Sequence, residues 1–470
     1  MIQINQTKNR VSLAGCFLGN KFLFISFTSL FAVGCTAKVN NLQHNTEPLP
    51  VAPRAINEFP KPNAEDGKWT LEEFYALAET QNSTLLMQAQ QINASRGRFR
   101  EAANPPNPEL IARDGSVASG NSTFSRGKMV GISQEILLPG KLSKAKNVEL
   151  QEIRSLEVDY QVALLQLRES IRRVVINLQA NLLLERLQWE YISAIDQIIS
   201  STEKQSDLNR LEIERKSLAL EITALVVENS VLGNQLETLL GLNKFGQIQS
   251  AAIQLILDKQ INSQALAQLD AIAEENFLPL ISRLYRLERE KANYSLVKSN
   301  LYDNPSVETT FGANDFTGEN EVGLGIRFPL PLFSRQQGNI QTAEAMIAFE
   351  SEQYRNEERE LKRELSELQQ RSNELDTFIV EYRDNIIPWA ESSFDKVASE
   401  LRTSQTTIHD YLSILQRLLV VKQTAILYQR DLSLVQSRVQ TYLNFADPQY
   451  SPVNLPQSPT DFQNSTAIIP

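Results

Sequence analysis

Residues 320–340 read NEVGLGIRFPLPLFSRQQGNI and join a strand pattern to a helix pattern through a proline-rich turn. Val322, Leu324 and Ile326 alternate with glycine and charged residues, which is the period of two that predicts a β-strand with one apolar face. Two prolines end this strand, and a glycine precedes a long helical pattern. A short strand that leads directly into a very long helix decides the fold class.

The same plan occurs twice along the chain. Residues 305–314 alternate as the partner of the strand just described, and residues 109–117 and 127–137 form two strand candidates in the first half. Leu138-Pro-Gly-Lys141 aligns with Leu332-Phe-Ser-Arg335 at the end of each strand pair. The sequence therefore predicts a structural duplication with two strands in each half.

Two long helices follow the strands of the first half. Residues 141–200 carry apolar side chains at the 3-4 spacing of a coiled-coil seam, and residues 208–241 continue it with interruptions at Arg215 and Asn229. These two residues are expected to face a lumen or to set the register of the seam. A helix of about 60 residues is about 90 Å long, which favours long helical hairpins over a globular domain.

The second half repeats this pattern with one difference. A seam leads to Pro388, which is expected to kink the helix, and a last helix covers about 408–444. Each strand pair is also preceded by a shorter helix, predicted at about 70–103 and 266–300. The predicted organisation is a signal peptide (1–34), an extended tether (35–66), a first repeat (67–242), a connector (243–265), a second repeat (266–446) and a flexible tail (447–470).

Residues suited to catalysis or metal binding are scarce. The 470 residues include two His, two Cys and four Met, too few for a Cys/His zinc cluster or a soft copper site. Neither His44 nor His409 is placed for a serine-type triad, so the sequence predicts no enzyme, no cofactor and no resident metal. The net charge of −10 excludes the basic surface of a nucleic-acid-binding protein.

The N-terminus has the features of a bacterial lipoprotein signal. Basic residues precede the apolar run 22–33, which ends in Ala32-Val-Gly-Cys35. This predicts lipid attachment at Cys35. The match at Cys16 has too short an apolar run before it, whereas a plain signal peptide with an incidental cysteine stays open as the alternative.

The four strands suggest a membrane wall. Strands of about nine residues suit an outer-membrane barrel, but a sheet with free edges is excluded from lipid and four strands cannot close alone. Three copies would supply twelve strands, enough for a conduit. The alternative is two small soluble hairpins that cap a coiled-coil rod.

Residues 328–340, FPLPLFSRQQGNI, resemble the strand-to-helix junction of TolC-family outer-membrane factors, in particular the cobalt–zinc–cadmium branch, and residues 134–141, QEILLPGK, fit as its counterpart in the first repeat. The resemblance covers about residues 70–445. It implies a mainly α fold with a small β part, in which coiled-coil hairpins form a periplasmic α-barrel. The four strands of each chain are implied to join a twelve-stranded outer-membrane β-barrel that a homotrimer shares. The implied partners are a periplasmic adaptor (membrane fusion) protein and an inner-membrane, proton-driven pump of the RND class.

The same resemblance assigns roles at the periplasmic tips of the hairpins. Asp207 and Asp410 fall on aspartates of the family's aperture, where an acidic ring favours cations. The tip residues implied to contact the adaptor are Ser201, Ser206, Ser404 and Thr407. The alternative interpretation of Asp207 is a helix N-terminal residue favoured by the helix dipole. His409 is interpreted as a solvated tip residue, with a metal ligand as the alternative.

The sequence thus predicts a passive exit duct for heavy-metal cations, in the outer membrane of a Gram-negative bacterium and anchored by lipid at Cys35. A channel for drugs or secreted polypeptides stays open as an alternative. So does a lipid-anchored coiled-coil scaffold without a pore.

Overall fold

The computed structural model describes residues 68–118, 124–242, 276–314, 320–331, 335–403 and 405–447, together with residues 246, 248 and 253. Of residues 114–118, 124–127, 313, 314 and 321 only the backbone is described. The helices are α1 (Leu71–Gln81), α2 (Ser83–Glu101), α3 (Lys141–Ile199), α4 (Gln205–Leu239), α6 (Leu278–Ser299), α7 (Gln337–Glu381), α8 (Ile387–Arg402) and α9 (Ile408–Phe445). The strands are β1 (Glu109–Ala118), β2 (Phe124–Glu135), β3 (Ser306–Asn314) and β4 (Asn320–Arg327).

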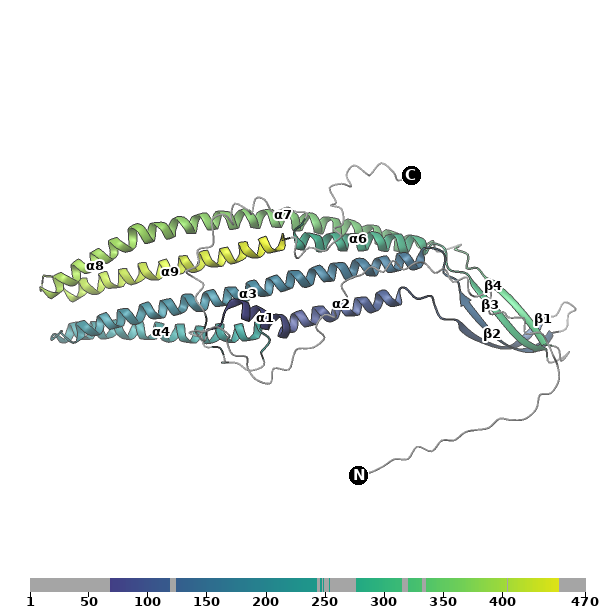
Figure 1. Cartoon of the computed structure of the whole chain (residues 1–470), viewed down its shortest axis with the longest axis horizontal. Helices are drawn as coiled ribbons and strands as arrows, with labels where there is room; N and C mark the ends of the chain where they lie inside the picture. Colours follow the sequence, from purple (N-terminus) through teal and green to yellow (C-terminus); the bar gives the residue numbers. More distant parts are fainter. Residues whose placement is uncertain are drawn as a thin grey trace, which may run out of the picture. The chain divides into compact units, whose positions relative to one another are not determined.

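The long helices form two hairpins, as the seams predict. Helix α3 packs along α4, and α9 packs against α7 and α8, while α3 also contacts α9 so that the hairpins lie side by side (Figure 1). The predicted seam of α3 is buried at Ile171, Val174 and Leu178. The mainly α fold with a small sheet is confirmed. No helix in the described part of the chain is long and apolar enough to cross a membrane.

The strands form one antiparallel sheet in the order β1-β2-β3-β4. The two halves therefore join through the pairing of β2 with β3, in which Gln134 lies opposite Val307. Asn304, which lies between α6 and β3, reinforces this joint. Its Oδ1 accepts the N–H of Leu138 at 3.1 Å, and its Nδ2 donates to Glu135 at 2.6 Å.

The helix expected over residues 70–103 is two helices that meet at Asn82. Thr70 and Glu73 form a capping box at the start of α1, with the Thr70 N–H donating to Glu73 at 2.8 Å. Asn82 ends α1, and its Oδ1 accepts two N–H groups of the first turn of α2 at 2.9 and 3.2 Å. Its Nδ2 donates to the carbonyl of Leu239 at 2.8 Å, which fixes this joint to the end of α4.

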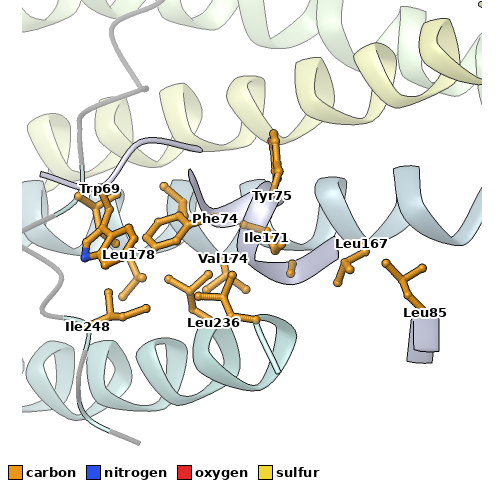
Figure 2. Packing of buried hydrophobic residues seen from close by; sticks show 14 residues of the cluster. Trp69, Phe74, Tyr75, Leu85, Leu167, Ile171, Val174, Leu178, Leu236 and Ile248 are labelled. Carbon is orange, nitrogen blue, oxygen red and sulfur yellow. The ribbon is translucent and has the colours of Figure 1, made fainter. Parts of the chain in front are cut away.

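A hydrophobic cluster fills the space between α1, α3 and α4 (Figure 2). Trp69 and Phe74 stack with ring centroids 5.4 Å apart, and Leu236 is fully buried beside them. Gly241, expected to end α4, has a φ of 73°, and a Cβ there would lie 2.3 Å from the carbonyl oxygen of Gln81. Only glycine fits this close approach.

Pro388 disturbs its helix as expected, through a π-helical turn at Tyr382–Ile386. The N–H of Ile387 donates to the carbonyl of Tyr382, five residues back. Because proline lacks an N–H and crowds the carbonyl four residues earlier, the wider turn relieves the clash. The helix expected over 266–300 is seen as α6 from Leu278; residues 266–275 lie outside the described residues.

Candidate functional site

One face of the sheet is apolar and exposed. Cross-strand register places Leu110 opposite Ile132 and Thr309 opposite Leu324 on this face. Leu110 and Leu324 are each 77% exposed. Further exposed apolar residues on the same face are Val130, Ile132, Phe311, Val322 and Ile326. An apolar patch of this kind marks a surface that another apolar phase or molecule covers.

The opposite face of the sheet is polar and lined with glycine. A Cβ at Gly131 would lie 2.5 Å from the Thr309 carbonyl oxygen, and one at Gly323 would lie 2.4 Å from Thr310 Oγ1. Added Cβ atoms at Gly323 and Gly325 would lie 3.8 Å from the Cβ atoms of Thr310 and Glu308, closer than the usual separation of about 4.5–5.5 Å between opposed Cβ atoms. The strands therefore approach closely on this face.

An ion-pair network crosses the polar face. Glu308 on β3 lies 3.2 Å from Arg113 on β1 and 3.6 Å from Arg327 on β4. Its side chain is 14% exposed, whereas those of the two arginines are 51% and 66% exposed. The face thus keeps its charged groups in water while it ties three strands together.

The edges of the sheet are open. Strand β1 pairs only with β2 and strand β4 only with β3 within the described residues. Each outer strand therefore presents a row of backbone N–H and C=O groups that pairs with no other strand of the described chain.

Helix α4 carries a second stripe of apolar residues on the side away from α3. Ile213, Leu220 and Val227 follow at seven-residue spacing, with exposures of 68%, 72% and 60%, and Val231 continues the row. The seam toward α3, which includes Leu211, is buried. Two seams on one helix indicate neighbours on two sides, and no helix of the described chain covers this second stripe.

The opposite edge of the helical layer is also open. Contacts run from α4 to α3, from α3 to α9, and from α9 to α7 and α8, so α4 lies at one edge and α7–α8 at the other. Val380 on α7 and Trp389 on α8 are 48% and 70% exposed. A head-to-tail arrangement of copies can join these two unlike edges into a ring.

The first hairpin turns between α3 and α4. Ser201 and Ser206 are exposed, as expected for tip residues that contact a partner, and the Ser201 hydroxyl donates to the carbonyl of Ile198 at 3.0 Å. Asp207 lies in the first turn of α4, where the helix dipole favours an acidic group. Lys204 forms an ion pair with it at 3.6 Å.

The second hairpin turns between α8 and α9, and Asp410 belongs to a capping box there. The Thr407 hydroxyl donates to Asp410 Oδ2 at 2.6 Å, and the Asp410 N–H donates to Thr407 Oγ1 at 3.2 Å. These bonds from Thr407, with smaller contributions from Thr406 and the nearby His409, hold the pKa of Asp410 below its usual range. Ser404 lies outside the described residues, as does Cys35.

The two hairpins are connected above their tips. Apolar residues of both pack into one cluster, and Gln416 on α9 donates to Glu214 on α4 at 2.7 Å. No contact between Asp207 and Asp410 occurs within the described chain, so the two candidate aperture residues are on neighbouring tips without touching. The described residues also include no group of three or more His, Cys, Asp or Glu side chains that could hold a metal.

The two interruptions of the α4 seam serve different purposes. Arg215 Nε lies 2.7 Å from Asp196 Oδ1 on α3, an ion pair that fits a role in setting register. Asn229 is buried, and its Oδ1 finds no hydrogen bond among the described groups. Buried polar residues at such seams fix register at a cost in stability.

No protein-family model and no curated protein matches this sequence. Solved structures do. VceC, an outer membrane protein of Vibrio cholerae, is 16% identical over 81% of this chain and 95% of that chain, with a TM-score of 0.62. The Neisseria gonorrhoeae MtrE outer membrane channel is 14% identical over 79% and 88%, with a TM-score of 0.63. CusC is 16% identical over 79% and 91%, with a TM-score of 0.61. The chain therefore has the TolC-like fold seen in outer-membrane channels.

The capping box predicts an acid-sensitive start of α9. Because the folded pKa of Asp410 is lowered, its carboxylate stabilises the helix start above its usual pKa of about 3.9, and this is lost as the pH falls through the folded value. In the unmodified protein, hydrogen–deuterium exchange of the peptide that begins α9 should accelerate as the pH falls through the folded pKa of Asp410.

In Asp410→Asn the same peptide should exchange faster already at neutral pH and show no acid step. Thr407→Ala, which removes the cap, should destabilise the start of α9 by about 1 kcal/mol. Asp207→Asn is the matched control at the other tip and should leave this peptide unchanged. An acid step of equal size in Asp410→Asn would contradict the assignment.

Proposed function

We propose that this chain is the outer-membrane exit duct of a tripartite RND-type efflux system and itself performs no chemistry. The observation that carries the proposal is the sheet, with an exposed apolar face on one side and a crowded, glycine-lined polar face on the other. Such a sheet suits a wall between lipid and a water-filled lumen. The TolC-like fold supports the same reading, because the similar structures described above are outer-membrane channels.

The open sheet edges support a homotrimer. In lipid each unpaired backbone group costs several kcal/mol, so β1 and β4 must pair with strands of other copies. Four strands from each of three copies make a twelve-stranded barrel. The apolar stripe of α4 and the exposed side chains of α7–α8 are the edges that would join below it in a periplasmic α-barrel.

The helix tips are proposed as the meeting point with the partners. Ser201, Ser206, Ser404 and Thr407 are the proposed contacts for a periplasmic adaptor protein, which links the duct to an inner-membrane RND pump. Three copies of Asp207 and Asp410 would form the negative collar at the aperture. Cys35 is the proposed lipid anchor in the outer membrane.

Heavy-metal cations are the proposed cargo. This assignment rests on the sequence resemblance of residues 328–340 to the heavy-metal branch. The sequence identities with CusC and VceC are both 16% and do not favour one branch over another. Drug export by the same duct is the second candidate, and a lipid-anchored scaffold without a pore is the alternative from a different class.

The orientation of the sheet can be tested with two neighbouring residues of β4. Leu324→Lys places a charge on the proposed lipid face and should weaken insertion by about 2–4 kcal/mol. Gly325→Lys is the matched control, since its Cβ points to the polar face and meets only Glu308 Cβ at 3.8 Å. The measurement is the fraction of refolded protein that inserts into phospholipid vesicles. Equal loss in both variants would contradict the assigned orientation.

Ring closure can be tested on α4. Leu220→Glu should prevent assembly, because it buries a charge in the proposed contact between copies. Ala219→Glu, the exposed neighbour outside the stripe, should leave assembly intact. Light scattering of the detergent-solubilised protein gives the number of chains. A trimer that survives Leu220→Glu would exclude this stripe from the contact.

The duct and its cargo need separate measurements. Purified protein in planar bilayers should form trimeric, conducting channels, and the absence of any conducting species would overturn the duct. Deletion of the gene should raise sensitivity to zinc, cobalt, cadmium or copper, with rescue by the intact gene. Increased drug sensitivity with unchanged metal tolerance would replace the metal assignment by the drug assignment.

A further inference from the structure

A cavity of about 440 Å³ lies between α1, α3 and α9, away from the open edges of the chain. Ligand sites in proteins typically measure about 300–1,000 Å³. One chain supplies the whole lining, so the cavity does not depend on the proposed trimer. Helix α9 lines it with a row of amide and hydroxyl side chains: Ser433, Gln436, Gln440, Thr441 and Asn444.

Tyr75 brings a buried hydroxyl to this cavity. The side chain is 4% exposed, and its hydroxyl makes no hydrogen bond of good geometry. Figure 2 shows that the Phe74 ring points toward Trp69 and Leu236, whereas the Tyr75 ring points the other way, toward α9. Burial raises the pKa of Tyr75 despite the lowering effect of Arg172, so the hydroxyl stays protonated and able to donate.

Arg172 is the cation beside this hydroxyl. It is half-buried on α3 and lines the cavity. The other charged residues of α3 there have partners, since Arg168 pairs with Glu79, and Glu169 pairs with Arg438 at 3.0 Å. Arg172 forms no ion pair with any carboxylate in the described part of the chain. A guanidinium withdrawn from water normally has an anionic partner.

Glu72 is the carboxylate that could compete for Arg172. It also lines the cavity, but it is exposed and forms no ion pair with Arg172 among the described groups. The inner part of the cavity therefore holds a guanidinium with no carboxylate partner among the described groups, a buried hydroxyl beside it and a row of amides. This set of donors is the one that recognises a carboxylate.

We propose that this cavity is a binding site for a carboxylate group, held by Arg172 and Tyr75 and flanked by the amides of α9. The carboxylate belongs either to a small organic acid or to an acidic side chain in an extended peptide. Because the walls come from both hairpins, a bound carboxylate links α1 and α3 to α9. The site is independent of the cargo and of the aperture.

Isothermal titration of the full-length detergent-solubilised protein tests the site with two probes. Glutarate represents a small organic acid, and acetyl-Ala-Glu-Ala-amide represents an acidic peptide; acetyl-Ala-Gln-Ala-amide is the neutral control. Binding by glutarate identifies a small acid, and binding by the glutamate peptide alone identifies a protein segment. Equal binding of the Glu and Gln peptides, or no binding of either carboxylate at millimolar concentration, would overturn the proposal.

Three variants separate binding from a structural role. Arg172→Gln should weaken binding about tenfold or more and Tyr75→Phe roughly threefold, while Glu72→Gln should strengthen it because a competing carboxylate is removed. The melting temperature without probe should be unchanged in Arg172→Gln and Glu72→Gln, which shows that both fold. Weakening by Glu72→Gln, or unchanged affinity in Arg172→Gln, would contradict the site. All of these measurements report binding of the probe. If the protein failed to conduct in planar bilayers, the proposed duct would be contradicted, but the carboxylate site would still be tested.

Discussion

The open edges of the four-stranded sheet are the constraint on which the rest of the structure depends. Backbone groups at β1 and β4 need partners that the described part of the chain does not provide. Strand β2 leads into α3 and strand β4 into α7 through short connections, so whatever pairs the edges also sets the spacing of the long helices. The unpaired stripe on α4 repeats this incompleteness in the helical part. The sheet edges and the exposed stripe of α4 therefore both need partners from outside the described chain.

Periodicity alone predicts most of the secondary structure. Period two in residues 305–314 and 320–329 and the 3-4 seam of α3 reflect burial on one face, which is a local property of the chain. Periodicity does not reveal the break between α1 and α2 at Asn82. The side-chain amide of Asn82 is held there by a hydrogen bond to Leu239, more than a hundred residues away. The tight fit of Gly241 against Gln81 is likewise a property of the packed structure.

The sequence alone identifies only part of the candidate site. Asp410 was identified by resemblance, yet the spacing Thr407-x-x-Asp410 also carries a capping signal, as Thr70-x-x-Glu73 does at α1. The second stripe of α4 could have been found from its seven-residue spacing. The meeting of Tyr75, Arg172 and the amides of α9 could not, because three helices distant in sequence build that cavity.

The two halves of the chain differ in the continuity of their long helices. Helix α3 runs through 59 residues without interruption, while its counterpart is divided by the π-helical turn before Pro388. Bending stiffness depends on a continuous ladder of hydrogen bonds, and a defect concentrates curvature at one level. A bending force is therefore expected to spread along α3 but to act mainly at the π-helical turn between α7 and α8. The long helices of the two halves thus respond differently to the same force.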